Sequence, residues 1–213
     1  MEWKQIPLGP LQTNGYLFYN ENKEGVMIDP GGDEKKLISF IKELNITING
    51  VLLTHAHFDH IGAVDAVRKE FHAPVYLHEK EADWLIDPAL NGSGLFQGIP
   101  QIKTQPADKL LKEEHTLKIG TLEFIVYETP GHSPGSVSYY VPEEKVIFSG
   151  DVLFHGGVGR TDLPGGDHDT LMNTIHEKLL NLPDDTIVAN GHGPSTTIGE
   201  EKEINPFING FGW

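Results

Sequence analysis

The sequence predicts an α/β protein built as a four-layer αββα sandwich, in which two β-sheets pack face to face with helices outside. Apolar runs of strand length, bounded by Gly, Pro, Asn or Asp, recur along the chain. A strand-rich stretch, a helix, a strand and a second helix follow one another twice, which favours two sheets over one doubly wound parallel sheet. The 213 residues, 38% of them hydrophobic, suit a single domain over 1–213.

The first half begins with three apolar runs, which predict strands at Tyr16–Tyr19, Val26–Ile28 and Gly50–Thr54. Between the second and third runs, four apolar residues recur at helical spacing and predict a helix over Asp33–Leu44. Aspartate is a favoured N-cap residue, so we expect Asp33 to cap the start of this helix.

Beyond the third strand, the pattern predicts a helix over Gly62–Phe71, a strand at Val75–His78 and a short acidic helix over Glu79–Ile86. The segment Asp87–Pro106 contains three glycines and several prolines, so we expect a long surface loop there. Loops of this length inside a compact domain are often functional.

The second half returns to strands. Leu122, Phe124 and Val126 share one face of a predicted strand over Thr121–Tyr127, because side chains alternate between the two faces of a strand. A glycine-rich loop is expected over 150–166. The remaining predicted elements are strands at Val137–Val141, Val146–Phe148 and Thr186–Ala189, and a helix near Thr170–Leu180.

Charge and composition exclude several classes of function. The chain has 16 Lys and Arg against 31 Asp and Glu, a formal charge of −15, so we expect no nucleic-acid partner and no anionic membrane. It has no cysteine, which excludes disulfides, thiolate metal sites and cysteine nucleophiles. The N-terminus has no signal-peptide pattern and no apolar run reaches 18 residues, so we expect a cytoplasmic protein.

The most informative stretch is an H-x-H-x-D-H motif directly after the predicted strand that ends at Thr54. It places His55, His57, Asp59 and His60 in one short loop. Imidazoles and a carboxylate gathered in this way are costly to desolvate unless a cation binds them. The motif therefore predicts a metal site with nitrogen and oxygen ligands.

Three more candidate ligands follow predicted strands and stand beside glycines. They are His132 in Pro-Gly-His, Asp151 in Ser-Gly-Asp and His192 in Gly-His-Gly. Glycine allows the sharp turns that would bring each side chain to the sheet edge. Five histidines and two aspartates exceed the needs of one tetrahedral zinc ion, and suit two metals that share a bridging carboxylate and a bridging water.

These motifs, together with Asp29-Pro30-Gly31-Gly32, occur in an order that resembles the metallo-β-lactamase superfamily, and within it the short glyoxalase II-like hydrolases. The resemblance covers nearly the whole chain. It implies the metallo-β-lactamase fold, with the metal site at one edge of the two sheets. It also implies two divalent metal ions, zinc first, with iron or manganese as alternatives.

Carried over by position, the resemblance implies that His55, His57 and His132 hold the first metal. It implies that the second metal is held by Asp59, His60 and His192, and that Asp151 bridges the two. Asp29 would hydrogen-bond a ligating histidine and fix its tautomer, or it is a plain turn residue before Pro-Gly-Gly. No ligand role is assigned to the other six histidines.

Two features bear on the substrate. Arg160, one of only two arginines, either contacts a substrate carboxylate or pairs with Asp162. Apolar residues on or near the long loop either line a substrate cleft or pack in the core: Trp84, Leu85, Leu95 and Phe96.

The resemblance implies a metal-dependent hydrolase that cleaves a small thioester, such as a hydroxyacyl-thiol conjugate, with a metal-bridging hydroxide. In this mechanism Asp59 and Asp151 are the catalytic residues. Because only 21 residues follow His192, we expect no C-terminal helical domain for thiol binding. The absence of a signal pattern and of cysteine argues against antibiotic hydrolysis.

A different chemistry within the same resemblance is a mononuclear iron persulfide dioxygenase. Its iron would be held by His55 or His57, with His132 and Asp151, as a two-histidine, one-carboxylate set. Metal content and oxygen uptake distinguish the two enzymes. A nuclease is disfavoured by the charge, and a metal-binding protein without catalysis would not need so complete a ligand set.

Overall fold

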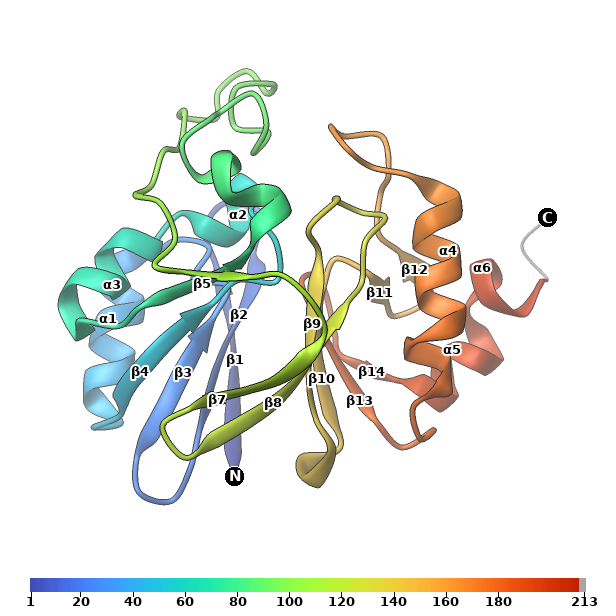
Figure 1. The fold of residues 1–213 in the computed structure, drawn as a ribbon, viewed down its shortest axis with the longest axis horizontal. Coiled ribbons are helices and arrows are strands. Elements are labelled where there is room, and N and C mark those ends of the chain that lie inside the picture. Colours follow the sequence, from blue (N-terminus) through green and yellow to red (C-terminus); the bar gives the residue numbers. More distant parts are fainter. Residues whose placement is uncertain (211–213) are drawn as a thin grey trace. The chain divides into compact units, whose positions relative to one another are not determined.

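A computed structural model describes residues 1–210 of the chain, whose path is coloured from blue to red in Figure 1. The chain forms two compact units. The first contains Met1–Lys112 and Leu117–Glu123, and the second contains Glu113–Thr116 and the described residues from Phe124 onwards. The single domain expected over 1–213 stays a prediction.

The first unit contains a mixed six-stranded sheet with the strands in sequence order. Its first three strands are antiparallel, and the strands from β3 to β6 pair in parallel. Parallel neighbours need crossover connections, which helices provide here. The strands are β1 (Glu2–Leu8), β2 (Thr13–Tyr19), β3 (Glu24–Ile28), β4 (Thr47–Leu52), β5 (Val75–His78) and β6 (Lys109–Leu111).

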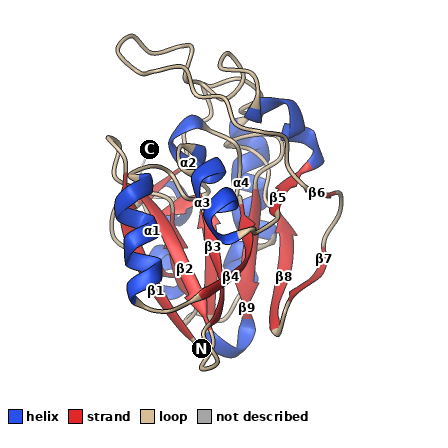
Figure 2. Ribbon diagram, turned by 90° about the vertical axis from the view of Figure 1, so that its left-hand side faces the viewer, coloured by secondary structure: helices blue, strands red, loops and turns tan. Residues whose placement is uncertain are grey.

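Helices α1 (Glu34–Glu43) and α3 (Val64–Phe71) lie on the same side of the strands β2, β3 and β4 (Figure 2). Leu37 and Ile41 of α1 and Val67 of α3 are fully buried in one core cluster that includes residues of β2, β3 and β4. Burial of these apolar side chains fixes the helices on the sheet. The short helix α2 (Phe58–Ile61) precedes α3, and a 3₁₀ helix, η1 (Glu79–Leu85), follows β5.

A second six-stranded sheet has the order β14-β13-β10-β9-β8-β7. Strands β10 and β13 are parallel, whereas β8, β9 and β10 pair as antiparallel neighbours. Strands β11 and β12 form a separate two-stranded hairpin. The strands are β7 (His115–Ile119), β8 (Leu122–Glu128), β9 (Val137–Val141), β10 (Val146–Gly150), β11 (Leu153–Phe154), β12 (Gly157–Val158), β13 (Ile187–Asn190) and β14 (Thr196–Thr197).

In the second unit, helices pack against strands β10 and β13 and form a core with them. Leu171 and Ile175 of α4 and Ile198 of α5 are fully buried with Ile147 of β10 and Val188 of β13. The helical elements are η2 (Pro142–Glu144), α4 (His168–Glu177), η3 (Leu179–Asn181), α5 (Ile198–Ile204) and α6 (Pro206–Asn209). The sheets and helices confirm the predicted α/β class.

Several predicted elements change at their ends. The helix expected over 62–71 begins at Val64, and α2 stands apart from it. The short helix expected over 79–86 is the 3₁₀ helix η1, and the helix expected to reach Leu180 ends at Glu177 before η3. The long loop is confirmed, because no helix or strand lies between η1 and β6.

The predicted capping role of Asp33 is wrong. Asp33 lies at the N-cap position, but its φ of 51° is left-handed and its side chain makes no hydrogen bond to the helix. Instead its Oδ2 accepts a hydrogen bond from the Gly9 amide at 3.0 Å. The carboxylate therefore ties the start of α1 to the turn after β1.

No helix among residues 1–210 is both long enough and apolar enough to cross a membrane.

Candidate metal centre

In the first unit, residues of the predicted site follow the carboxyl ends of two parallel strands. β3 ends at Ile28, which pairs with Leu52 at the end of β4. Asp29 follows β3 directly, and its amide donates to the Leu52 carbonyl at 3.0 Å. The backbone of Asp29 has a φ of 46°, an unusual value for a residue with a Cβ and one often found where function demands it.

The buried carboxylate of Asp29 accepts three hydrogen bonds. Oδ1 accepts from the Thr54 amide at 2.8 Å, and Oδ2 accepts from the Thr54 hydroxyl at 2.6 Å. Oδ2 also lies 2.9 Å from Nδ1 of His60, which is fully buried. Asp29 is thus both a turn residue and the partner of a predicted ligand, so the two interpretations of the sequence describe one residue.

These contacts fix where the imidazole protons lie. A carboxylate only accepts hydrogen bonds, so Nδ1 of His60 carries the proton. Because the Thr54 hydroxyl gives its hydrogen to Asp29, its oxygen accepts from Nδ1 of His55 at 3.0 Å. In both rings the lone pair is then on Nε2, the form in which histidine binds a metal.

The ligand atoms of Asp29, His55 and His60 lie within 4.8 Å of one another, close enough for an ion. Nδ1 of His55 and Nδ1 of His60 each carry a proton, so hydrogen bonds rather than an ion hold Asp29, His55 and His60 together. The nitrogens that remain to bind a metal are the Nε2 atoms.

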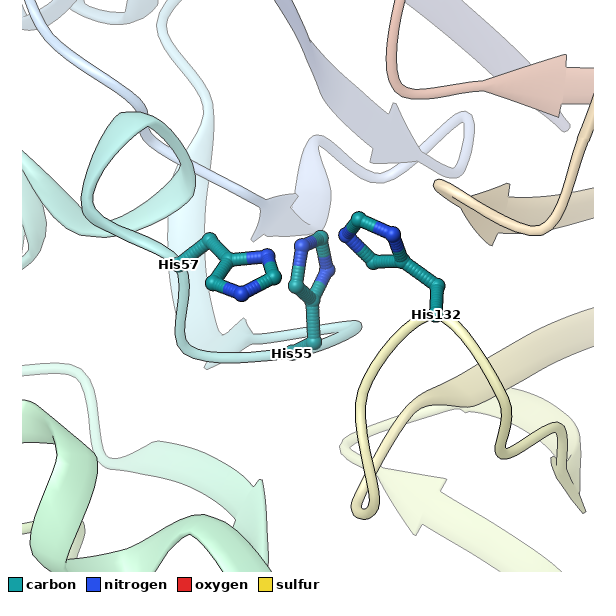
Figure 3. A group of neighbouring side chains, drawn as sticks. All are labelled: His55, His57 and His132. Carbon is teal, nitrogen blue, oxygen red and sulfur yellow. The ribbon is translucent and has the colours of Figure 1, made fainter. Parts of the chain in front are cut away.

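The rest of the H-x-H-x-D-H motif lies on the same loop and on α2. His55 and His57 are 1% and 3% exposed, and their ring centroids are 4.8 Å apart (Figure 3). Oδ2 of Asp59 accepts from the Thr13 hydroxyl at 2.6 Å and lies 3.6 Å from Nε2 of His60. The structure therefore brings all four motif residues together within the first unit.

The Asp29-Pro30-Gly31-Gly32 motif also has a steric role. A Cβ on Gly31 would lie 2.0 Å from the carbonyl oxygen of Asp59, so only glycine allows this approach. The Pro30 carbonyl accepts from the Ala63 amide at 2.8 Å. The turn after β3 is thereby packed against α2, which carries two predicted ligands.

The second unit uses parallel strands in the same way. Gly150 of β10 pairs with Asn190 of β13, and the Gly191 amide donates to the Gly150 carbonyl at 2.8 Å. Asp151 and His192 follow these strand ends. Oδ2 of Asp151 lies 3.4 Å from Nε2 of His192 and 3.7 Å from Nε2 of His132.

His132 is 2% exposed and stands on the loop between β8 and β9 (Figure 3). Its Nδ1 lies 2.7 Å from the carbonyl oxygen of Arg160. A carbonyl only accepts hydrogen bonds, so Nδ1 is protonated and Nε2 carries the lone pair. Nε2 is also the atom that faces Asp151, which makes these two atoms a natural pair of donors for a cation.

Gly131 allows the turn that presents His132. Its φ of 132° lies in a region that residues with a Cβ rarely adopt. A Cβ there would lie 2.3 Å from Cα of Leu171 at the start of α4. The loop is held further by the Thr174 hydroxyl, which donates to the Pro130 carbonyl at 2.9 Å.

The side chain of Arg160 pairs with Asp162. Nε and Nη2 donate to the two carboxylate oxygens at 2.7 and 2.8 Å, a two-pronged pair between exposed side chains. The hydrogen bonds from Arg160 lower the pKa of the Asp162 carboxyl to about 2. The ion pair is therefore present, and substrate binding by Arg160 stays a prediction.

We expect Arg160→Gln to return the pKa of Asp162 from about 2 towards its ordinary value of 3.8. The folded-state pKa is lowered, so the pair stabilises the fold above pH 4 and loses this effect as the pH falls towards 2. Carboxyl titration by NMR measures the shift. Lys145→Gln, which removes the partner of Asp185, is the control and should leave Asp162 unchanged. An unchanged Asp162 in Arg160→Gln would contradict the assignment.

The four apolar residues near the long loop divide into two pairs. Trp84 and Leu85 are buried, and the Trp84 ring lies 5.5 Å from the His57 ring. Leu95 and Phe96 are 51% and 38% exposed, and Phe96 contacts Phe58 of α2 at 6.0 Å between ring centroids. Trp84 and Leu85 therefore pack in the core, whereas Leu95 and Phe96 are exposed enough to contact a substrate.

Sequence reasoning missed three polar residues of this site. Thr13 and Thr54 hold Asp59, Asp29 and His55 through their hydroxyl groups. Glu81 is a fully buried carboxylate that accepts from the Ala56 amide. Thr54 directly precedes the motif, which was a usable signal. Thr13 and Glu81 lie far from it in the sequence and carried none.

The donor set fits divalent metal ions. It combines imidazole nitrogens with aspartate oxygens, and it contains no thiol. In His55, His60 and His132 the other ring nitrogen lies within hydrogen-bond distance of a protein oxygen. The family model of the metallo-β-lactamase superfamily matches residues 8–192. The chain belongs to the metallo-β-lactamase superfamily.

Named relatives in this superfamily cover almost the whole chain. The chain is 51% identical to "Probable metallo-hydrolase YqgX" of Bacillus subtilis over 99% of both proteins. It is 40% identical to "Hydroxyacylglutathione hydrolase GloC" of Haemophilus influenzae over 96% of both. These names support a metal-dependent hydrolase.

Solved structures confirm the metallo-β-lactamase fold. The crystal structure of the B3 metallo-β-lactamase BLEG-1 matches with a TM-score of 0.95 and 61% identity, over 97% of this chain and 99% of that one. TTHA1623 in a di-iron form matches at 0.84 and 42%, over 96% and 100%. ETHE1 from Myxococcus xanthus matches at 0.79 and 30%, over 99% and 85%. The donor residues and the fold support the use of divalent metal.

Proposed function

We propose that the protein is a binuclear metal-dependent hydrolase that cleaves a small thioester, such as a hydroxyacyl-thiol conjugate. The observation that carries this proposal is that Nδ1 of three predicted ligands lies within hydrogen-bond distance of a protein oxygen. His60, His55 and His132 each donate from Nδ1 to a protein oxygen, so each offers Nε2 to a metal. Burial of several imidazoles in one site costs free energy unless a cation binds their nitrogens.

The proposed first set of ligands is His55, His57 and His132, and the proposed second set is Asp59, His60 and His192, with Asp151 shared. Two divalent cations held by these residues would lower the pKa of a water so that hydroxide is available at neutral pH, and would polarise the carbonyl of the substrate. Asp59, held by the Thr13 hydroxyl, orients the attacking water. The thiolate leaving group needs no strong acid, so no further proton donor is required.

The choice of a thioester rests on the relatives. The 40% identical protein is named a hydroxyacylglutathione hydrolase, and the 51% identical protein is named a metallo-hydrolase. The substrate would be a small molecule. Neither a nucleic acid nor a membrane suits a chain with a formal charge of −15.

A second candidate activity is the hydrolysis of β-lactams. It is favoured by the neighbour of 61% identity, which is described as a B3 metallo-β-lactamase. The absence of a signal pattern and of cysteine disfavoured antibiotic hydrolysis, whereas this similarity favours it. Both substrates contain a carbonyl that an activated water would attack, so one assay that compares a thioester with a β-lactam shows which of the two is cleaved faster.

The third candidate is the mononuclear iron persulfide dioxygenase. The 42% identical neighbour was solved in a di-iron-bound form, which supports iron as a candidate metal for these ligands. About one iron per chain with oxygen consumed on a persulfide supports the dioxygenase. About two metals per chain with no oxygen consumed supports the hydrolase.

The test is a hydrolysis assay on protein with a measured metal content. We expect the zinc-loaded protein to cleave a hydroxyacyl thioester, and Asp59→Ala and His132→Ala to lower kcat/KM at least about 10³-fold, about 4 kcal/mol of transition-state stabilisation. His176→Ala, an exposed histidine of α4, is the matched control and should keep full activity. A protein with normal metal content that cleaves neither thioester nor ester would refute the proposal.

A further inference from the structure

The 3₁₀ helix η1 carries a buried carboxylate, Glu81, which lies beside the H-x-H-x-D-H loop. The two acidic residues in its first turn, Glu79 and Glu81, differ in burial, since the side chain of Glu79 is 45% exposed and Glu81 is fully buried. Oε2 of Glu81 accepts a hydrogen bond from the Ala56 amide at 2.6 Å. Burial of a carboxylate is costly, so a fully buried one calls for a specific role.

The position of the bonded amide suggests that role. Ala56 is the residue between His55 and His57, and both belong to the proposed first metal set. A charge-assisted hydrogen bond to a backbone N–H is short and strong, and it restrains the peptide to which the N–H belongs. Any shift of the Ala56 peptide would move both imidazoles.

The same helix restrains this loop a second time through Trp84. The Trp84 ring is 6% exposed and lies 5.5 Å from the His57 ring at an angle of 41°. Asn91 extends the support, because its Nδ2 donates to the Trp84 carbonyl at 2.9 Å and its own carbonyl accepts from the Phe58 amide. The backbone on both sides of His57 is therefore held by side chains and carbonyls from 81–91.

We propose that Glu81 is a positioning residue, which sets the spacing of His55 and His57 for the metal through its bond to the Ala56 amide. This inference rests on the proposed metal site and is independent of the substrate. Partners of this kind around metal-binding histidines typically change metal affinity 10-fold to 100-fold when they are removed.

The test measures metal binding rather than turnover. Zinc affinity is determined by competition with a chelator, and the ligand geometry is read from the visible spectrum of the cobalt-substituted protein. We expect Glu81→Ala to weaken zinc binding about 10-fold to 100-fold and to shift the cobalt spectrum. Glu81→Gln should recover most of the affinity, because its amide oxygen accepts the same Ala56 N–H. Glu79→Ala, an exposed change in the same turn, should match the wild type.

A purely structural role predicts a different result. Glu81→Ala would then lower the melting temperature of the metal-free protein while zinc affinity and the cobalt spectrum stay as in the wild type, and this outcome refutes the inference. It is also refuted if Glu81→Gln binds zinc as weakly as Glu81→Ala.

If Glu81→Ala does not fold, Glu81→Asp replaces it, since its shorter side chain keeps the charge but draws the carboxylate away from Ala56. Affinity should then be lower in Glu81→Asp than in Glu81→Gln, and the reverse order refutes the inference. Failure of thioester hydrolysis refutes the proposed function alone. A wild type that binds no metal refutes both.

Discussion

Asp29→Ala is expected to destabilise the metal-free protein by about 3–5 kcal/mol and to weaken metal binding about 10-fold to 100-fold. The substitution removes the acceptor of three buried hydrogen bonds, two from Thr54 and one from His60. It also places alanine at a φ of 46°, which costs roughly 1–2 kcal/mol. Thermal unfolding of the metal-free protein, followed by circular dichroism, measures the first effect, and chelator competition measures the second.

Asp29→Asn separates the two effects. Asparagine tolerates the left-handed backbone, and its amide oxygen can still accept from the Thr54 amide. Its NH₂ group would replace Oδ2, however, and would face Nδ1 of His60 as a donor. His60 would then have to carry its proton on Nε2. We expect Asp29→Asn to be more stable than Asp29→Ala but to bind metal as weakly, and wild-type affinity in Asp29→Asn would contradict the tautomer assignment.

The strand-end positions of the ligands could be predicted from sequence, because an apolar run of strand length followed by Gly and by His or Asp is a local pattern. Asp29 follows β3 and His55 follows β4 closely, while Asp151 and His192 follow β10 and β13. In the structure each of these two pairs of strands is parallel, and parallel neighbours end at the same edge of their sheet, which brings the side chains of each pair together. The resemblance to a family added which residue serves which metal.

The partners of the ligands could not be predicted, because burial is a tertiary property. Glu81 lies in a short acidic segment whose composition is typical of a solvated helix, yet it is fully buried. Thr13 gains its role only where β2 places it against Asp59. Asp33 failed as a predicted cap for the same reason, since the nearby Gly9 amide competes for its carboxylate.

Elements with weak patterns were missed. β1 carries Pro7 and alternates exposed charged residues with partly buried ones, so it has no continuous apolar run. A proline is tolerated there because β1 stands at the edge of its sheet. β14 has two residues and α6 has four, lengths at which periodicity carries no signal.

Removal of metal is expected to lower the melting temperature by about 8–16 °C at a free zinc concentration about 1,000 times the dissociation constant. A ligand that binds only the folded state contributes about 4 kcal/mol at this ratio, and 1 kcal/mol corresponds to about 2–4 °C for a chain of this length. The physical reason lies in the buried donors. His55, His57, His60 and His132 are at most 3% exposed, so without a cation these imidazoles lie in a poorly hydrated site.

Calorimetry with and without a chelator measures this shift, and restored zinc should reverse it. The decisive feature is its form: the melting temperature should rise with the logarithm of free zinc, because the stabilisation follows mass action. His132→Ala lacks one proposed donor and should show a smaller dependence, whereas His176→Ala should follow the wild type. A melting temperature that does not depend on zinc would mean that these imidazoles are stabilised by the protein alone, and the proposed metal centre would be wrong.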